Sequence, residues 1–307
     1  LYGESRKPTP EMLDGLEALI IDLQDVGTRV YTYIWTIKLC MEACNEAGLP
    51  IWILDRPNPI SVMRFDGPML SPDLFTFVGG AEIPLCHRMT IGEMASLMRA
   101  AYFPKLDLNV VWMEGWWRDS LFSDLGLPWV LPSPNMPTLD TAIVYPGMVL
   151  LEATTLSEGR GTTTPFELFG APYVNVKQLK EKLPRLTIPG CVFREHAFIP
   201  SFQKWRQEYC YGMQVHVTNP RKYSPVLTTV AILSEISQTA NPGFELIGPP
   251  YEYEYEKRPF DMVAGNSYLG DQLKGPVNLE EIADQWREER KSFLIQFKEI
   301  SRYPEEL

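Results

Sequence analysis

EALIIDLQDVGTRVYTYIWTIKLCMEACNEAGLPIWILDRPNP, residues 17–59, is the most informative segment of this 307-residue chain. Two short apolar runs, at residues 17–23 and 51–54, predict buried strands. Between them the pattern predicts a helix that ends at Ala47, with Gly48 as its C-terminal stop and Pro50 beyond it. A strand, a helix and a second strand within about 40 residues form a βαβ unit, in which the strands are parallel and the crossover is right-handed. The segment therefore predicts an α/β fold built on a parallel sheet.

The rest of the chain extends this pattern and then departs from it. Thr90 and Glu93 form a capping box that opens a helix over residues 91–102, and a third strand follows at 108–112. Residues 128–137 are rich in proline and predict a shaped loop. The second half predicts a helix at 175–183, a strand at 211–217, a helix at 225–238 and one long amphipathic helix at 279–300. We expect a Rossmann-like parallel-sheet domain over residues 1–152 and a smaller α/β domain over residues 153–307.

Composition excludes several classes of protein. The chain has 28 Lys and Arg against 39 Asp and Glu, a net charge of −11 that disfavours binding to nucleic acid. It contains no run of 18 apolar residues, so no membrane-spanning helix is expected. No P-loop and no G-x-G-x-x-G follows a predicted strand, which disfavours a nucleotide-dependent enzyme, and no cofactor is implied. The five cysteines show no metal-ligand spacing; Cys40 and Cys44 could bind a metal from one helix face, but burial as small apolar residues is the commoner role.

Two aspartates follow the predicted parallel strands at their carboxyl ends, where α/β sheets bind ligands. Asp25 and Asp55 could share general acid–base chemistry or hold sugar hydroxyls, or each could cap the turn that follows it. Arg29 and Arg56 lie close behind them and could grip a substrate carboxylate. His87 precedes a helix start and could reach the same crevice, although a structural role is equally open.

A second segment, Glu158-Gly159-Arg160-Gly161-Thr162-Thr163-Thr164-Pro165, offers a tight backbone path, three hydroxyls and two charges. It could form part of a binding site or could be a flexible link between domains. No G-x-S-x-G is present and the chain has only three histidines, so a Ser-His-Asp hydrolase is disfavoured.

Five motifs in order along the chain resemble one family. They are QDVGTRVYTY at 24–33, LDRPNP at 54–59, PSPNMP at 132–137, EGRGTT at 158–163 and FDMVAG at 260–265. The chain resembles the NamZ exo-β-N-acetylmuramidases, glycoside hydrolases of bacterial peptidoglycan recycling. The resemblance implies two α/β domains with the site in the cleft between them, release of N-acetylmuramic acid from non-reducing glycan ends, and an extracytoplasmic location. The alternative is a non-catalytic protein that binds muropeptides or sugars in the same cleft.

The resemblance also suggests roles for single residues. Asp25 and Glu158 are the candidate catalytic carboxyl groups. The lactyl carboxylate of muramic acid suits an arginine, and the sugar hydroxyls and acetamido group suit Asp, Asn, His and Thr side chains. An aromatic ring such as Tyr31 could stack on a pyranose, although apolar packing explains aromatics more often. The candidate substrate-binding residues are therefore Arg29, Tyr31, Asp55, Arg56, Asn58, His87, Asn135, Arg160, Thr162 and Thr163; no metal ligand is implied.

The family carries an upstream segment with a Gly-Pro-Glu-His-Gly type motif whose glutamate is the favoured acid. Nothing in residues 1–307 matches that motif. We therefore expect that the chain lacks the family's N-terminal segment, that Asp25 and Glu158 act as partner carboxylates, and that the strand at 17–23 lacks a neighbour.

Overall fold

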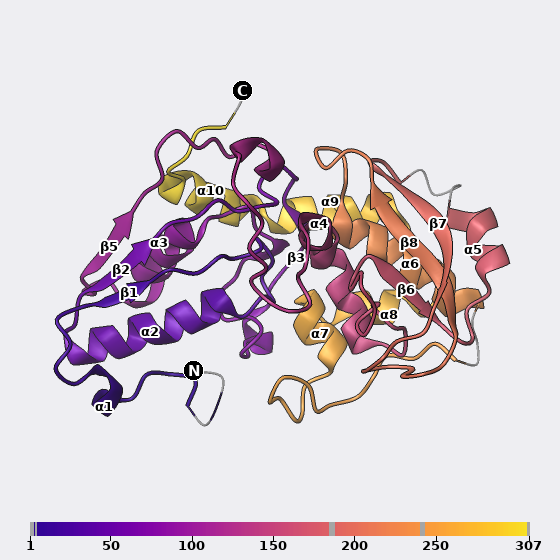
Figure 1. The fold of residues 1–307 in the computed structure, drawn as a ribbon, viewed down its shortest axis with the longest axis horizontal. Helices are drawn as coiled ribbons and strands as arrows, with labels where there is room; N and C mark the ends of the chain where they lie inside the picture. Colours follow the sequence, from indigo (N-terminus) through magenta and orange to yellow (C-terminus); the bar gives the residue numbers. More distant parts are fainter. Residues whose placement is uncertain (1–2, 4, 184–187, 240–242, 306–307) are drawn as a thin grey trace.

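The computed structural model describes residues 3, 5–183, 188–239 and 243–305. Figure 1 shows two units side by side, with the N-terminal sheet in one and most of the second half of the chain in the other. The mixed α/β fold confirms the predicted fold class. The predicted division of the chain at residue 152 stays a prediction.

The first unit is built on a three-stranded parallel sheet in the order β1-β2-β5. Its strands are β1 (Leu19–Ile21), β2 (Ile51–Leu54) and β5 (Leu108–Val111), with Leu19 opposite Ile51 and Ile51 opposite Leu108. The crossovers are α2 (Tyr33–Ala47), which ends at Gly48 in the left-handed region, and α3 (Ile91–Tyr102), which has the predicted capping box. The βαβ prediction is confirmed, as is the strand that follows α3.

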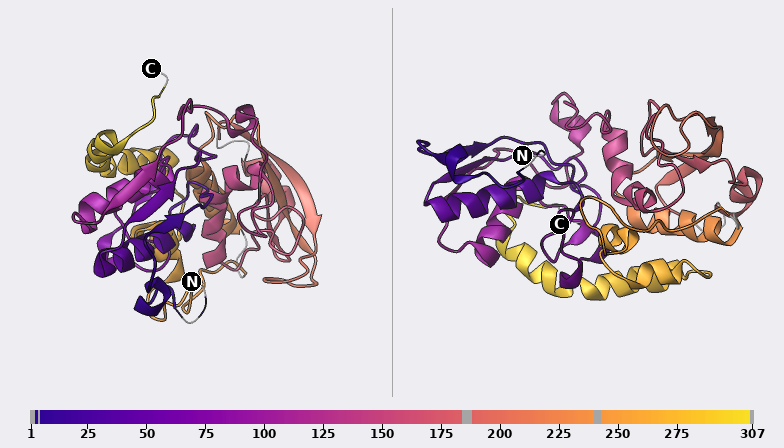
Figure 2. Two further views of the ribbon diagram at one scale, coloured as in Figure 1. Left: turned by 60° about the vertical axis from the view of Figure 1, so that its left-hand side comes forward. Right: turned by 90° about the horizontal axis from the view of Figure 1, so that it is seen from below.

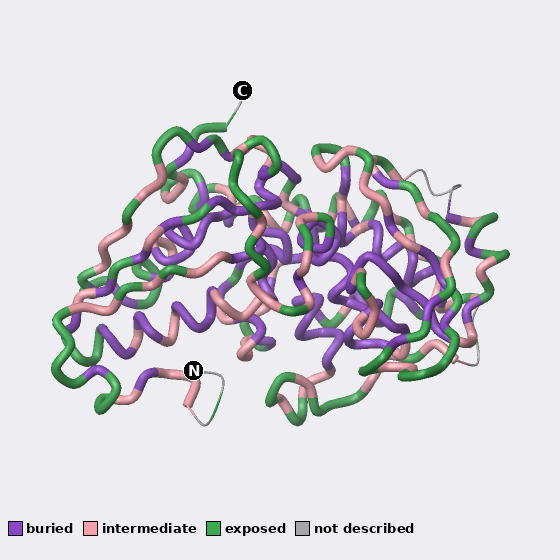
Figure 3. The backbone as a smooth tube through the Cα atoms, in the orientation of Figure 1, coloured by how far each residue is buried: buried purple, intermediate pink, exposed green. Residues whose placement is uncertain are grey.

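One face of this sheet carries the core of the first unit. Ile51 and Ile53 are fully buried against α2 and α3, whereas Ile20 and Trp52, at the alternate positions, are 63% and 41% exposed. Figure 3 shows buried, intermediate and exposed stretches alternating along the backbone of this unit. Both crossovers run on the same side of the sheet, so the opposite face has no helix over it among the described residues.

The remaining elements join the sheet to the second unit. The remaining strands form an antiparallel pair and a second antiparallel sheet in the order β6-β8-β7, and the other elements are helices that lie before, within and after the first sheet along the chain. Together these elements are α1 (Pro10–Leu13), β3 (Asp66–Met69), η1 (Pro72–Leu74), β4 (Pro84–Cys86), η2 (Phe122–Leu125), α4 (Leu139–Met148), η3 (Val149–Ala153), β6 (Leu168–Ala171), α5 (Val176–Lys182), β7 (Cys191–Phe198), β8 (Cys210–Val217), α6 (Pro225–Thr239), α7 (Pro259–Ala264), α8 (Tyr268–Gln272), α9 (Leu279–Glu289) and α10 (Lys291–Ile300).

The prediction of one helix over residues 279–300 is wrong. The chain turns at Arg290, which ends α9 and whose Nη1 donates to the Gly67 carbonyl at 3.0 Å. Trp286 of α9 packs in the core of the second unit, whereas Phe293 of α10 packs in the core of the first. Figure 2 shows the two helices following one another across both units. The apolar periodicity of the sequence continues through the bend, because α9 and α10 each have a buried apolar face. Periodicity alone therefore does not reveal the bend.

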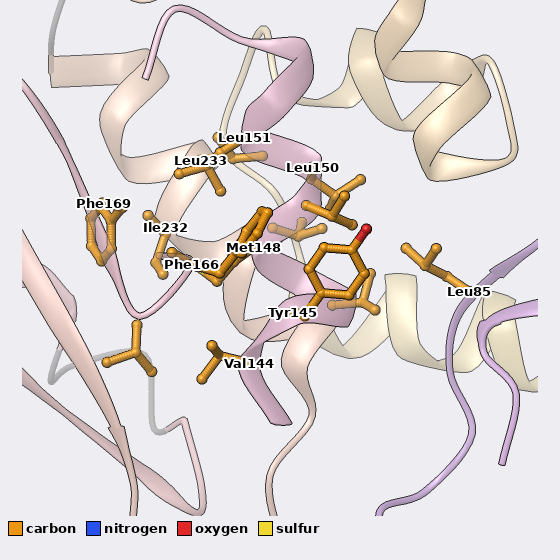
Figure 4. Packing of buried hydrophobic residues seen from close by; sticks show 14 of the residues in the cluster. Leu85, Val144, Tyr145, Met148, Leu150, Leu151, Phe166, Phe169, Ile232 and Leu233 are labelled. Carbon is orange, nitrogen blue, oxygen red and sulfur yellow. The ribbon is translucent and has the colours of Figure 1, made fainter. Parts of the chain in front are cut away.

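The second unit has the larger core, centred on α4, η3, β6 and α6. Figure 4 shows Tyr145 and Met148 of α4 between Phe166 and Leu150 in this core. None of the helices in the described ranges is both long and apolar enough to cross a membrane.

Candidate active site

Asp25 lies in the turn after β1 and is only 3% exposed. The N–H of Gly27 donates to its Oδ2 at 2.7 Å, and Gly27 has a φ of +75°. A Cβ at Gly27 would lie 2.4 Å from the Asn58 side chain, so the turn requires glycine. The other oxygen, Oδ1, is buried and accepts no hydrogen bond of normal geometry from the described residues. Burial raises the pKa of Asp25 to about 7, although the N–H groups of Gly27 and Val26 oppose the shift.

His87 is fully buried against Asp25. Its Nδ1 accepts a hydrogen bond from the Met89 N–H at 3.2 Å, which assigns the ring proton to Nε2. Nε2 lies 3.7 Å from Asp25 Oδ2. Burial, with the positive charges of Arg29 and Arg118, lowers the pKa of His87 to about 3. The imidazole is therefore neutral near pH 7 and presents an N–H to the carboxyl group of Asp25.

A row of tyrosines connects this pair to the second unit. The ring of Tyr31 lies edge-on to Tyr33, with centroids 5.0 Å apart, and to Tyr145 of α4 at 6.1 Å. Tyr145 in turn contacts Phe166 at 4.8 Å. Burial raises the pKa of Tyr145, and the negative charges of Glu152 and Asp25 contribute to the rise, so both acidic groups lie within electrostatic range of this tyrosine.

Glu158 and Glu152 form the acidic group of the second unit. Glu158 is 2% exposed; its Oε2 lies 2.9 Å from Lys204 Nζ and its Oε1 3.9 Å from Arg160 Nε. Arg160 Nη2 donates to Glu152 Oε1 at 2.6 Å, and the Tyr251 hydroxyl donates to Glu152 Oε2 at 2.7 Å. Burial raises the pKa of Glu152, and Arg160 opposes that rise. Two carboxyl groups therefore share one guanidinium.

Glu152 was missed by the sequence reasoning. It is the one charged residue in the otherwise uncharged run VLLEATTL at 149–156. A single carboxyl group in an apolar segment is expected to be buried, and a buried carboxyl group needs a hydrogen-bond or charge partner. This pattern could have identified Glu152 from the sequence.

The loop that begins at Glu158 is packed rather than loose. Gly161 has a φ of +83°, and a Cβ there would lie 2.7 Å from the Phe202 carbonyl. Its own carbonyl accepts from the Ser201 N–H at 2.9 Å. The Thr162 hydroxyl closes a turn by donating to the Gly159 carbonyl at 2.6 Å, while Thr163 is exposed. This packing does not fit the alternative that the segment is a flexible link, and its role in a binding site stays a prediction.

Three of the predicted binding residues use their side-chain hydrogen bonds within the protein. Asp55 Oδ1 accepts from the Gly92 N–H at 2.8 Å, and its Oδ2 accepts from the hydroxyls of Thr90 and Tyr303, so it caps α3. Arg29 is fully buried and donates to the carbonyls of Pro68, Ile83 and Val263. Asn58 donates to the Met89 carbonyl and accepts from the Ile60 N–H. These contacts favour the capping alternative for Asp55 and leave Arg29 and Asn58 holding the main chain.

Arg56 is more accessible. It pairs with Asp22 through Nε at 2.5 Å and Nη2 at 2.9 Å, and its side chain is 45% exposed. The pair stands between two hollows of about 440 and 490 Å³, the first lined also by Tyr33 and the second by Asp55. Asn135 lies partly exposed in the proline-rich loop that leads from Trp129 to α4. The structure therefore brings Asp25, Tyr31 and His87 together, and Glu158 with Arg160, but it leaves Asp55 in a different hollow from Tyr33.

No group of His, Cys, Asp and Glu within the described ranges has the arrangement of a metal site. Cys40 and Cys44 are free and buried in the core of the first unit, and burial raises the pKa of both thiols. This packing fits the apolar role that was the commoner alternative for the pair.

Glycoside hydrolases generally use two carboxyl groups, and the buried carboxyl groups of Asp25 and Glu158 are compatible with this class. Two family models match the chain in order. The N-terminal model of the exo-β-N-acetylmuramidase NamZ covers residues 1–140, and the C-terminal model covers residues 143–303. The chain belongs to the NamZ family.

Individual relatives agree with this assignment. The peptidoglycan β-N-acetylmuramidase NamZ of Bacillus subtilis (strain 168) is 43% identical over 302 residues, which are 96% of this chain and 71% of that protein. A solved DUF1343 family protein from Bacteroides fragilis NCTC 9343 superposes with a TM-score of 0.86 at 30% identity, over 98% of this chain and 79% of its own. A second such protein from the same organism gives a TM-score of 0.77 at 27% identity, over 97% of this chain and 79% of its own.

Proposed function

We propose that the protein is an exo-β-N-acetylmuramidase that releases N-acetylmuramic acid from the non-reducing ends of peptidoglycan fragments. The observation that carries this proposal is the match of both NamZ models, in order, to almost the whole chain. The relative from Bacillus subtilis carries the name of the same activity. Peptidoglycan lies outside the cytoplasmic membrane, so we propose an extracytoplasmic location and a role in cell wall recycling.

The two acidic groups suit the two roles that glycoside hydrolysis needs. With a pKa of about 7, Asp25 still carries its proton in about half of the molecules at neutral pH, as a general acid must. The Gly27 N–H holds Asp25 Oδ2 at 2.7 Å, and His87 Nε2 lies 3.7 Å from the same oxygen. Glu158, held between Lys204 and Arg160, supplies the second carboxyl group. We assign the proton donor to Asp25 and the partner carboxylate to Glu158.

In this proposal, Arg56 recognises muramic acid. The sugar differs from glucosamine by a lactyl ether whose carboxylate needs a cation. Arg160 is committed to Glu152 at 2.6 Å and Arg29 is fully buried, whereas Arg56 is half-exposed and also lines the hollow of about 490 Å³. Exchange of Asp22 for a lactyl carboxylate would keep the two parallel N–H···O bonds of the guanidinium.

The test is turnover of the β-1,4-linked disaccharide of N-acetylmuramic acid and N-acetylglucosamine, followed by chromatography of the released sugars. We expect the unmodified protein to release both sugars and Asp25→Asn and Glu158→Gln each to lose at least about 100-fold in kcat. Glu181→Gln, on the exposed side of α5, is the matched control and keeps full activity.

Each alternative has its own outcome. Affinity for the disaccharide without release would identify a binding protein. Full activity in both variants would show that neither Asp25 nor Glu158 is the proton donor.

A further inference from the structure

The proline-rich loop and the end of the sheet enclose the hollow of about 440 Å³. Gln24, which precedes Asp25, and Arg56 line one wall, while Phe122 and Trp129 of the loop line the other. In Figure 1 the loop is the magenta segment that descends between η2 and α4 at the centre of the molecule. Asp25, the candidate proton donor, follows Gln24 in the sequence but does not line the hollow itself.

The loop is fixed at several points. The Tyr33 hydroxyl donates to the Pro132 carbonyl at 2.7 Å, and Trp129 Nε1 donates to the Met136 carbonyl at 3.1 Å. The ring of Phe122 packs edge-to-face with Trp129 at 5.5 Å. These contacts hold the indole in place before any ligand arrives.

The outer rim of the same loop is apolar and open. Leu127, Val130 and Leu131 are 51%, 71% and 53% exposed. Exposure of apolar side chains to water is unfavourable. Several exposed apolar side chains around a hollow therefore indicate a binding site. An open rim also lets a ligand extend beyond the hollow.

The lining contributed by the end of the sheet includes polar side chains beside Leu23 and Pro57. Gln24 Nε2 donates to the carbonyls of Asp25 at 2.7 Å and Pro57 at 2.9 Å, and no described residue donates to its Oε1, which keeps its capacity to accept a hydrogen bond. Asp22 adds a carboxylate to the lining, while its partner Arg56 stands between this hollow and the one of about 490 Å³, where it is assigned to the lactyl group. An aromatic wall facing hydrogen-bonding groups matches a pyranose, which has apolar C–H faces and a polar edge of hydroxyls.

We propose that this hollow binds the hexosamine on the leaving side of the scissile bond, with its ring against Trp129. The proposal rests on the proposed muramidase activity. The leaving sugar is chosen over the muramic acid because the rim is open, and a longer glycan must continue outward from the leaving sugar. Trp129 is then a specificity-determining residue of the reaction.

The experiment compares two substrates that share muramic acid but differ in the leaving group: the disaccharide with N-acetylglucosamine, and methyl β-N-acetylmuraminide, which has no second ring. Trp129→Ala lowers kcat/KM for the disaccharide about 10-fold and leaves that for the methyl glycoside unchanged, because only the disaccharide uses the aromatic contact. Trp129→Phe, which keeps a ring, recovers most of the loss. Trp117→Ala removes an exposed tryptophan outside the hollow and is the control.

Equal losses for the two substrates, or no loss in Trp129→Ala, would overturn the proposal. If the unmodified protein cleaves neither substrate, the proposed function fails, and saturation-transfer NMR with N-acetylglucosamine then decides on the hollow alone. Binding that Trp129→Ala weakens supports the sugar site, and the absence of binding to the unmodified protein removes it.

Discussion

At the scale of single residues, Asp25 and His87 are a buried pair in which burial disfavours the charged form of both groups. Burial raises the pKa of Asp25 to about 7 and lowers that of His87 to about 3. Their common cause is the loss of water, which penalises the charged form of an acid and of a base alike. A neutral carboxyl group beside a neutral imidazole is the form that this environment favours between these two values.

The first prediction concerns the stability of this pair. The folded pKa of Asp25 lies above its usual 3.8, so between about pH 4 and 7 the folded state binds more protons than the unfolded state, and Asp25 lowers stability as pH rises. Asp25→Asn removes this penalty, so its stability relative to the unmodified protein improves by about 3 kcal/mol between pH 5 and pH 8. Urea unfolding at both values measures the change, and His87 cancels in the comparison. Asp14→Asn, an exposed control, should show no such improvement; a pH-independent difference for Asp25→Asn would contradict the prediction.

The second prediction concerns the arginines. Arg56→Ala weakens binding of N-acetylmuramic acid by about 10- to 150-fold and leaves N-acetylglucosamine nearly unchanged, since a charge-assisted bond to the lactyl carboxylate is lost. Arg160→Ala affects both sugars alike, because it leaves Glu152 without its partner rather than removing a ligand contact. Calorimetric titration with both sugars distinguishes the two arginines. Equal losses for both sugars in Arg56→Ala would show that Arg56 does not recognise the lactyl group.

At the scale of elements, the start of α3 is the junction of three segments. Thr90 accepts from the Glu93 N–H and donates to Asp55, which also accepts from Tyr303 near the C-terminus. Glu93 itself pairs with Arg118, and both side chains are fully buried. The helix cap thus ties the end of β2 and the C-terminal segment to one point.

The third prediction follows from this junction. Thr90→Ala removes the cap and one partner of a buried carboxylate, and it costs about 2–3 kcal/mol of unfolding free energy, more than an ordinary cap substitution. Thr90→Ser keeps the hydroxyl and should lose less than about 1 kcal/mol. Urea unfolding at constant pH measures both. A loss of the same size in the serine variant would show that the methyl group, and not the cap, matters.

At the scale of the whole molecule, the parallel sheet has one covered and one open face. Ile20, Trp52 and Val111 of neighbouring strands are all exposed on the open side, and β1 pairs only with β2 among the described residues. Parallel sheets are normally covered on both faces, and an apolar face beside a free edge favours association with another chain.

The fourth prediction is that residues 1–307 self-associate through this face. The double variant Ile20→Lys with Trp52→Gln reduces the associated fraction several-fold, which sedimentation velocity over a range of concentrations measures. Val192→Lys, at an exposed apolar position of β7 in the other unit, is the control and should leave association unchanged. If the double variant associates as strongly as the unmodified chain, this face is not the cause.

The sequence alone determined the local elements of the first unit and the family. β2, α3 and the stop at Gly48 follow from short-range rules, because apolar alternation, caps and glycine conformations involve residues within a few positions of each other. The five ordered motifs indicated the NamZ family for the same reason: each is a continuous string.

The tertiary structure alone decided which of the candidate polar groups are already satisfied. Asp55 meets Tyr303, 248 positions away, and Arg29 meets Val263 across 234 positions, so neither partner could be inferred from the neighbouring sequence. Glu152 is paired with Tyr251 by a similar long-range contact. The bend at Arg290 is likewise explained by a distant partner, the Gly67 carbonyl. A polar side chain is available to a ligand only when no distant main chain or side chain has taken its hydrogen bonds, and that competition is settled by packing.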